Sequence, residues 1–175
     1  IIVSVLTFEA ALLLQRTKPK IIAITGNVGK TSTKDAIYAV LKDYIHTRKS
    51  EKSYNTELSI PLTILGLRNA NNNPFRWMKN IIDGMFLVLF HQNYPEVLVI
   101  EAGVDHPGDM GRLAKWFKID VAVITRLPDV PVHVENFSSP EAVTEEKLIL
   151  LKALKPDGIF VYNHDDQKVR LAAEN

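Results

Sequence analysis

The sequence predicts an α/β fold in which a mostly parallel sheet is covered by helices on both faces. Four short runs are apolar at nearly every position, which is typical of parallel strands buried on both sides. Segments with apolar residues at helical spacing separate these runs, and such alternation builds a parallel sheet between helical layers. The 175 residues, 46% of them hydrophobic, are enough for one domain with a proper core.

The predicted strands and helices alternate along the chain. The strands cover Lys20–Thr25, Val97–Ile100, Ile119–Thr125 and Ile159–Tyr162. The helices cover Thr31–Asp43, Leu58–Leu67, Phe75–Phe90, Gly108–Phe117 and Glu141–Leu154. Proline is tolerated in a first helical turn, which accommodates Pro61 in the second helix. The polar, Asn-rich or Pro-containing stretches are predicted loops, at residues 44–57, 69–74 and 126–140.

The N-terminal residues form a separate apolar run, Ile1–Leu14, followed by basic residues. A signal peptide would carry its charges ahead of the run, and a membrane span needs about 20 apolar residues. This run is shorter and contains Glu9, so we expect a helix or linker over residues 1–19 that packs on a domain over residues 20–175. The alternative is the end of a membrane segment. Because the first residue is not Met, we interpret the chain as a fragment.

The charge and cysteine content exclude some functions. Lys plus Arg is 21 and Asp plus Glu is 20, so nothing in the charge balance favours a nucleic-acid partner. The chain has no cysteine, which excludes disulfides and thiolate chemistry and fits a reducing compartment such as the cytoplasm.

The first predicted strand runs into the motif Thr25-Gly-Asn-Val-Gly-Lys-Thr-Ser-Thr33. Glycines at a strand-to-helix turn let backbone N–H groups face an anion, and the helix N-terminus and a lysine add positive charge. We therefore expect a phosphate-binding loop for a nucleotide triphosphate. Its expected backbone donors are Gly26, Asn27 and Gly29; Lys30 would hold the β- and γ-phosphates, and Thr31 or Ser32 would offer a hydroxyl to Mg²⁺.

The motif departs from the common phosphate-loop pattern, because Ile24 stands where that pattern has a glycine. Two glycines around a two-residue tip make a tighter loop. The alternative interpretation is an ordinary strand–turn–helix connection with a surface lysine.

Further polar residues follow the other predicted strands. Ligands of open parallel sheets bind beyond the carboxyl ends of the strands. Glu101 ends the second strand and is a natural Mg²⁺ ligand beside a phosphate loop. Asn163 and Asp166 follow the fourth strand. His133 and Lys147 would not be singled out from their spacing alone.

These segments together resemble the central ATP-binding domain of the Mur ligases, and most closely the branch that adds D-alanyl-D-alanine to a UDP-muramoyl tripeptide. The resemblance covers about residues 18–170. Its segments are Thr25-Gly-Asn-Val-Gly-Lys-Thr-Ser-Thr-Lys34, Asn55-Thr-Glu-Leu-Ser-Ile-Pro-Leu-Thr63, Glu101-Ala-Gly-Val-Asp-His-Pro-Gly108, Asp120-Val-Ala-Val-Ile-Thr125, His133-Val-Glu135 with Lys147, and Pro156-Asp-Gly to Asn163-His-Asp-Asp166. Several motifs in one order are far more specific than any single motif.

The resemblance implies an ATP-dependent amide ligase of peptidoglycan precursor synthesis, which activates a carboxylate as an acyl phosphate. It implies that Lys30 and His133 are catalytic, and that Glu101 and His133 bind Mg²⁺ with Thr31. It also implies that Lys147 is catalytic and, once carbamylated, binds a second Mg²⁺.

The resemblance places Asn55 near the γ-phosphate and Asn163 and Asp166 near the adenine and ribose. The implied partners are ATP, a UDP-linked muropeptide and a dipeptide amine, for a cytoplasmic monomer; membrane contact through the N-terminal run stays open. The family's flanking domains are not among these residues, so we expect the fragment alone to be inactive.

The chain departs from the family pattern at several positions. Arg126 replaces an asparagine, and the loop before His133 is longer than usual. Glu145 and Glu146 precede Lys147, and a neighbouring carboxylate is expected to raise the pKa of that lysine and disfavour carbamylation. Two alternatives remain: a related ligase acting on another acid, of the folylpolyglutamate or cyanophycin type, and a nucleotide-binding module without ligase activity.

Overall fold

The computed structural model describes residues 1–51, 56–128 and 134–174. Its helices are α1 (Ile2–Thr17), α2 (Lys30–Leu41), α3 (Thr56–Leu65), α4 (Pro74–Leu89), α5 (Asp109–Ala114), α6 (Pro140–Leu148) and α7 (Gln167–Glu174), with 3-10 turns η1 (Val134–Asn136) and η2 (Ile149–Ala153). Its strands are β1 (Lys20–Thr25), β2 (Thr47–Lys49), β3 (Val97–Glu101), β4 (Ile119–Ile124) and β5 (Leu154–Tyr162).

The strands form one sheet in the order β2-β3-β1-β4-β5, and each described pair is parallel. β1 lies at its centre, where Ile22 pairs with Val99 of β3 and with Val121 of β4. Every residue of β3 is buried, which explains why its sequence is a continuous apolar run ending in a single carboxylate. The predicted parallel sheet is confirmed.

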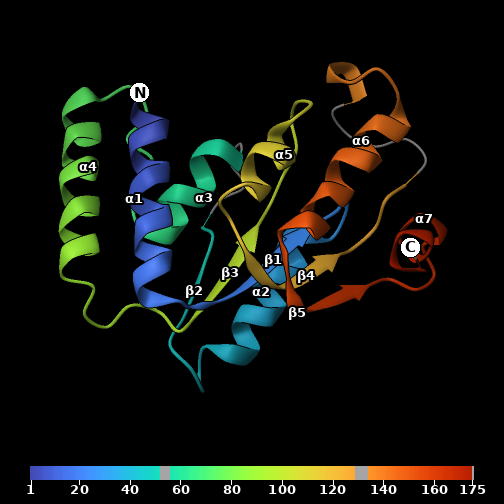
Figure 1. The fold of residues 1–175 in the computed structure, drawn as a ribbon, viewed down its shortest axis with the longest axis horizontal. Helices are drawn as coiled ribbons and strands as arrows, with labels where there is room; N and C mark the ends of the chain where they lie inside the picture. Colours follow the sequence, from blue (N-terminus) through green and yellow to red (C-terminus); the bar gives the residue numbers. More distant parts are fainter. Residues whose placement is uncertain (52–55, 129–133, 175) are drawn as a thin grey trace.

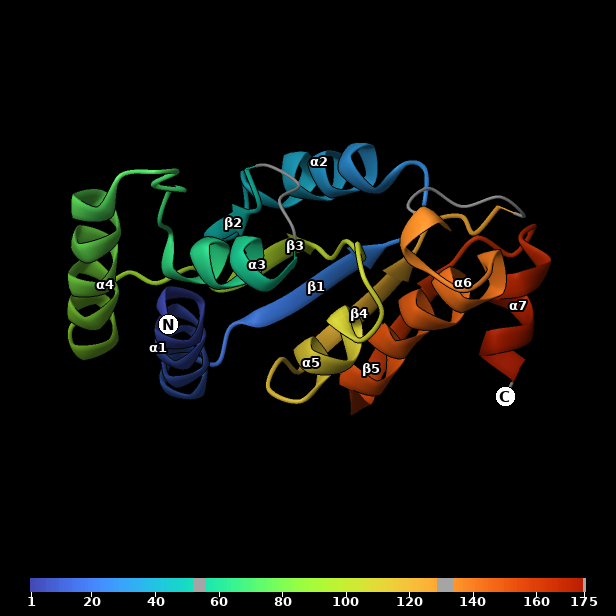
Figure 2. The same cartoon turned by 90° about the horizontal axis from the view of Figure 1, so that it is seen from above.

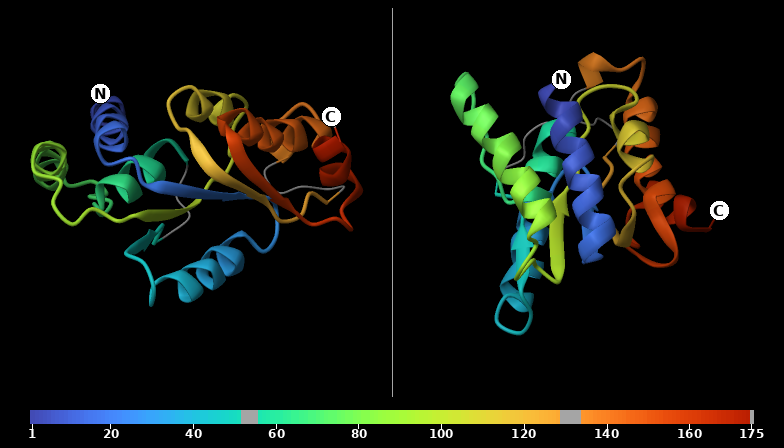
Figure 3. Two further views of the ribbon diagram at one scale, coloured as in Figure 1. Left: turned by 60° about the horizontal axis from the view of Figure 1, so that its bottom comes forward. Right: turned by 60° about the vertical axis from the view of Figure 1, so that its left-hand side comes forward.

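Helices cover both faces of the sheet (Figure 1). Figure 2 and the left view of Figure 3 show α2 alone on one side, and α1, α5 and α6 on the other. The larger core cluster joins apolar residues of α1, α3 and α5 to the sheet, whereas Ile37 and Leu41 of α2 pack on a smaller cluster. The predicted two-sided covering is therefore confirmed.

The predictions missed one strand and misplaced the ends of others, most clearly around β5. β2 was predicted as loop because its three residues, Thr-Arg-Lys, carry no apolar signal at the sheet edge. β5 begins at Leu154, before the Pro156-Asp-Gly turn signal, with an irregular register against β4. The helix predicted over Glu141–Leu154 ends at Leu148 and continues as the 3-10 turn η2.

The N-terminal residues form helix α1, which contacts α3 and α4. Leu6, Ala10 and Leu13 are fully buried in the larger core cluster. The expected packing of this helix on the domain is confirmed, while the division at residue 19 stays a prediction. Within the described ranges, none of the helices combines the length and apolarity required to cross a membrane.

One carboxyl group is buried between α1 and α4. Glu9 is 8% exposed, and its Oε2 atom has no hydrogen-bond partner among the described residues. A Cβ atom on Gly84 of α4 would lie 2.3 Å from this oxygen, so the glycine makes room for the carboxyl group. Burial raises the pKa of Glu9 from 4.5 to about 7.

Replacing Glu9 with glutamine is expected to stabilise the chain above pH 7. A raised carboxyl pKa contributes stability that is complete below pH 4.5 and lost as pH rises through about 7. The gain should be about 1–2 kcal/mol, less than the full shift allows because water reaches the edge of a helix pair. Urea unfolding at pH 5 and pH 8 measures it. The exposed Glu96→Gln is the control and should change the stability little at either pH. Equal gains from Glu9→Gln at both pH values would contradict a raised pKa of Glu9.

Candidate functional site

The loop between β1 and α2 is shaped by two glycines. Gly26 and Gly29 have φ angles of 137° and 86°, and Gly29 directly precedes the first residue of α2. A Cβ atom on Gly26 would lie 2.1 Å from the Thr125 hydroxyl oxygen, so no side chain fits there. The loop is therefore held tightly against the end of β4, with the α2 N-terminus behind it.

Two hydrogen bonds from the β4 side fix this loop. Thr125 Oγ1 donates to the Val28 carbonyl at 2.7 Å, and the Asn27 N–H donates to the Arg126 carbonyl at 2.8 Å. The second bond corrects the expectation that the Asn27 N–H faces an anion, since the Arg126 carbonyl already accepts it. Thr125 was not predicted as a site residue, although its place at a strand end beside the loop was the available signal.

Lys30 and Ser32 lie on the first turn of α2. Lys30 Nζ donates to the carbonyl of Asn27 at 3.2 Å, so the ammonium group lies over the loop. Ser32 is exposed at the same helix end. Both positions agree with a binding surface for an anion at this helix N-terminus.

Glu101 lies at the end of β3, next to the loop, and is 4% exposed. Thr31 Oγ1 donates to Glu101 Oε2 at 3.0 Å, and Lys34 Nζ lies 3.6 Å from the same oxygen. Ser50 Oγ accepts the Glu101 backbone N–H at 2.9 Å. Sequence reasoning missed Lys34, although it lies three residues after Thr31 on the same face of α2.

The expected Mg²⁺ ligands Thr31 and Glu101 are thus in contact, and both offer the oxygen donors that Mg²⁺ prefers. Across the described ranges, there is no group of three His, Cys, Asp or Glu residues that could hold a metal ion. Asn55 and His133 lie outside the described residues. The part of the predicted metal site that is described fits Mg²⁺, and His133 remains a prediction.

Lys147 is a buried lysine on α6, 2% exposed, whose Nζ atom has no hydrogen-bond partner in the described part of the chain. Its pKa is lowered from 10.5 to about 8, chiefly by burial and then by the nearby charge of Lys30, with Asp105 opposing. The Lys147 amine is thus within electrostatic range of the phosphate-loop lysine. The predicted Lys30, Thr31 and Glu101 lie together at one end of the sheet, where Thr31 contacts Glu101.

The expectation that Glu145 or Glu146 raises the pKa of Lys147 was wrong, because burial lowers this pKa and the carboxylate that opposes the shift is Asp105. Glu146 points to the start of α5, where its carboxylate accepts the N–H groups of Gly108 at 3.0 Å and Met110 at 2.8 Å. A carboxylate at a helix N-terminus is stabilised by the helix dipole. Because the Glu146 carboxylate is hydrogen-bonded to the start of α5, it does not offset the effect of burial, which is the largest cause of the lowered pKa of Lys147.

Asn163 and Asp166 lie beyond β5, at the edge of a separate open pocket. Asp166 Oδ2 accepts the Leu127 N–H at 2.6 Å, and Asp166 Oδ1 accepts the Lys168 N–H at 3.1 Å at the start of α7. The pocket lining is Arg126, Leu127, Pro128, Asn163, Asp165, Asp166, Gln167, Lys168 and Leu171. This pocket borders the phosphate loop through Arg126, whose carbonyl holds Asn27.

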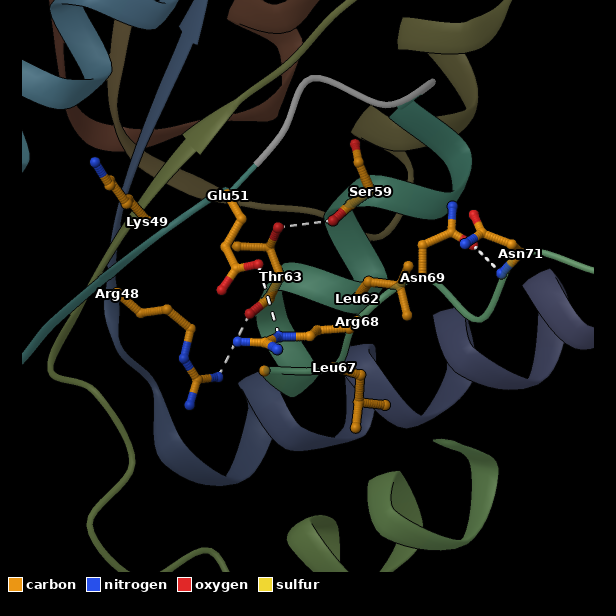
Figure 4. Close-up of a pocket in the computed structure, with 11 residues that line it drawn as sticks. Arg48, Lys49, Glu51, Ser59, Leu62, Thr63, Leu67, Arg68, Asn69 and Asn71 are labelled. Carbon is orange, nitrogen blue, oxygen red and sulfur yellow. Dashed lines mark hydrogen bonds and ion pairs between the residues drawn. The ribbon is translucent and has the colours of Figure 1, made fainter. Parts of the chain in front are cut away.

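A second pocket, of about 540 Å³, opens at the end of β2 (Figure 4). Arg48 reaches from β2 to the last turn of α3 and donates to the Ile64 carbonyl at 2.7 Å. Arg48 also lies 5.2 Å from the centre of the Tyr94 ring. These contacts close the C-terminal end of α3, and none of the predicted site residues that the structure describes lines this pocket.

Comparisons with known proteins agree with this geometry. The model of the Mur ligase middle domain matches residues 24–175. The chain is 29% identical over 153 residues to the UDP-N-acetylmuramoyl-tripeptide–D-alanyl-D-alanine ligase of Bacillus subtilis, covering 87% of this chain and 28% of that protein. It is 28% identical over 162 residues to the enzyme of the same name from Borreliella burgdorferi, covering 93% and 29%.

Solved structures give the same result. The MurF ligase from Thermotoga maritima in complex with ADP has a TM-score of 0.74 and 29% identity, covering 97% of this chain and 34% of that chain. Escherichia coli FolC in complex with DHPP and ADP has a TM-score of 0.56 and 18% identity, covering 99% and 44%, and so shares the fold alone. The chain spans less than a third of the length of the curated relatives named above. The chain belongs to the Mur ligase middle domain family.

Proposed function

We propose that this chain is the ATP-binding part of a ligase that joins a carboxylate to an amine at the expense of ATP. The specific reaction we propose adds D-alanyl-D-alanine to a UDP-muramoyl tripeptide in the cytoplasm. The observation that carries the proposal is the contact of Thr31 with Glu101 beside Lys30 at the phosphate loop, with the buried amine of Lys147 within electrostatic range of Lys30. The named relatives support the choice of substrates.

The charges of the site suit two anions that must approach each other, a triphosphate and a carboxylate. Lys30 lies at the α2 N-terminus and would hold the β- and γ-phosphates. Thr31 and Glu101 would hold Mg²⁺, which screens phosphate charge while the γ-phosphoryl group moves to the carboxylate. Asn163 and Asp166 would line the adenine and ribose side of the site. Asn55 and His133 remain proposed members.

Lys147 has the environment that carbamylation needs. The neutral amine attacks carbon dioxide, an N–C bond forms, and one proton leaves to solvent. A pKa near 8 leaves a sizeable neutral fraction at neutral pH. The product is an anionic oxygen ligand, which would give a role to a buried nitrogen that has no partner in the described residues.

Phosphate release by the whole protein tests the reaction. We expect inorganic phosphate and amide product only when ATP, the UDP-muramoyl tripeptide and D-alanyl-D-alanine are all present. Amide formation with a folate-type acid and glutamate instead would favour the related ligase, which the FolC-like fold keeps open. Steady ATP hydrolysis without either substrate would favour the nucleotide-binding module.

Replacing Thr125 with valine is expected to weaken ATP binding about tenfold, because the loop loses one hydrogen bond worth about 1–1.5 kcal/mol. The bond lost is the one that joins Thr125 Oγ1 to the Val28 carbonyl. Calorimetric titration of the whole protein with ATP measures the change. Thr7→Val on α1 is the control. Unchanged ATP affinity in Thr125→Val would contradict the proposal that the Thr125 hydroxyl holds the phosphate loop in place.

A further inference from the structure

Helix α4 has two apolar faces, and only one of them packs on the protein. Gly84 and Val88 are buried on the face that meets α1. The opposite face exposes large apolar side chains along its whole length: Phe75, Met78, Ile82, Met85, Phe86, Leu89 and, just beyond the helix, Phe90. Figures 1 and 2 show α4 at the outer edge of the molecule, with α1 between it and the sheet.

The exposed side chains form one continuous stripe. Their spacing of three and four residues places them on one side of a helix. At the end of the stripe the Phe86 and Phe90 rings stack, with centroids 6.3 Å apart. Scattered exposed apolar residues are ordinary, but a row of this length marks an interaction surface. No element of the described structure covers it.

Exposed basic side chains lie at both ends of the stripe. Arg76 and Lys79 are exposed in the first half of α4, and the acidic residue of the helix, Asp83, is paired with Lys79. At the other end Arg16 and Lys18 of the α1 end are exposed, and Arg16 Nη1 donates to the Val88 carbonyl at 2.9 Å. The stripe is therefore apolar with a basic rim.

We propose that α4 binds an anionic lipid surface, lying in the plane of the interface with its apolar stripe among the acyl chains. The basic rim would meet the lipid headgroups, as in amphipathic helices of peripheral proteins. The 16 residues of α4 are too few to span a bilayer. A second copy is disfavoured, because an antiparallel α4 pair would place Arg76 of one copy against Arg16 and Lys18 of the other.

Vesicle flotation of the whole protein tests this proposal. We expect binding to vesicles of phosphatidylcholine with phosphatidylglycerol, and much weaker binding to phosphatidylcholine alone. The double substitution Phe75→Ser and Phe86→Ser should reduce binding at least about tenfold through lost apolar burial, while high salt should also weaken it. The matched control is Val40→Ser and Tyr44→Ser, two exposed apolar residues at the end of α2.

Each other outcome counts against the proposal. Failure of the wild-type protein to float with anionic vesicles would overturn it. Concentration-dependent dimers that disappear in the Phe75/Phe86 variant would assign the stripe to a second copy instead. Circular dichroism and ATP binding should be unchanged in the variant, because neither residue lies near the phosphate loop.

Discussion

Replacing Gly26 with alanine is expected to abolish ATP binding and to lower the free energy of unfolding by about 2–4 kcal/mol. The added Cβ atom would lie 2.1 Å from Thr125 Oγ1, and the φ angle of 137° is one that alanine rarely adopts. Either the loop or the end of β4 must move. Both changes misplace the backbone that would surround the phosphates. Urea unfolding and calorimetric titration with ATP measure the two effects.

The matched control for this substitution is Gly111→Ala in α5. A Cβ atom at Gly111 meets nothing within 4 Å, and alanine suits a helix better than glycine. The control should keep ATP affinity and gain a fraction of a kcal/mol in stability. If Gly26→Ala bound ATP like the wild type, the proposed position of the phosphates would be wrong.

Replacing Lys147 with methionine is expected to abolish ligation and yet stabilise the protein at pH 7. A lysine with its pKa depressed to about 8 contributes stability above pH 10.5 that is lost as pH falls through about 8. At pH 7 the buried charge therefore costs stability, and methionine removes it with a gain of about 1–3 kcal/mol. The turnover should fall by at least about a hundredfold, because the proposed metal ligand is lost.

Two measurements separate this role from a structural one. Wild-type activity should rise with added bicarbonate and with pH up to about 8, where Lys147 becomes neutral. The exposed Lys152→Met should keep both the activity and the bicarbonate response. A Lys147→Met protein that is less stable at pH 7 but still active would contradict the assignment.

The sequence predicted most of the fold because its central strands are buried on both sides. Runs such as Val97–Ile100 contain no polar residue, so they cannot form a half-exposed strand or a loop, and they indicate parallel strands. β2 could not be predicted, since three polar residues at a sheet edge become a strand only through pairing with β3. β5 was predicted too short because the Pro156-Asp-Gly signal favours a turn, whereas pairing with β4 carries the strand through it.

The candidate site was predictable where a charged residue stands at a position that has a specific function in this kind of fold. Lys30 follows from the phosphate-loop motif, and Glu101 follows from its place at a strand end. Thr125 and Ser50 act through hydroxyl groups that support the loop and β3, and nothing in a single sequence distinguishes them from other hydroxyl residues. The pKa of Lys147 was mispredicted, because adjacency to Glu146 in the sequence does not reveal that this carboxylate turns toward α5.

The most direct test of the proposed chemistry follows one oxygen atom. The UDP-muramoyl tripeptide is labelled with a heavy oxygen isotope in its terminal carboxylate and incubated with the whole protein, ATP and D-alanyl-D-alanine. If the carboxylate is activated as an acyl phosphate, one labelled oxygen leaves with the phosphate when the amide forms. Mass spectrometry should then find inorganic phosphate carrying one heavy oxygen. Unlabelled phosphate formed together with amide would contradict the account.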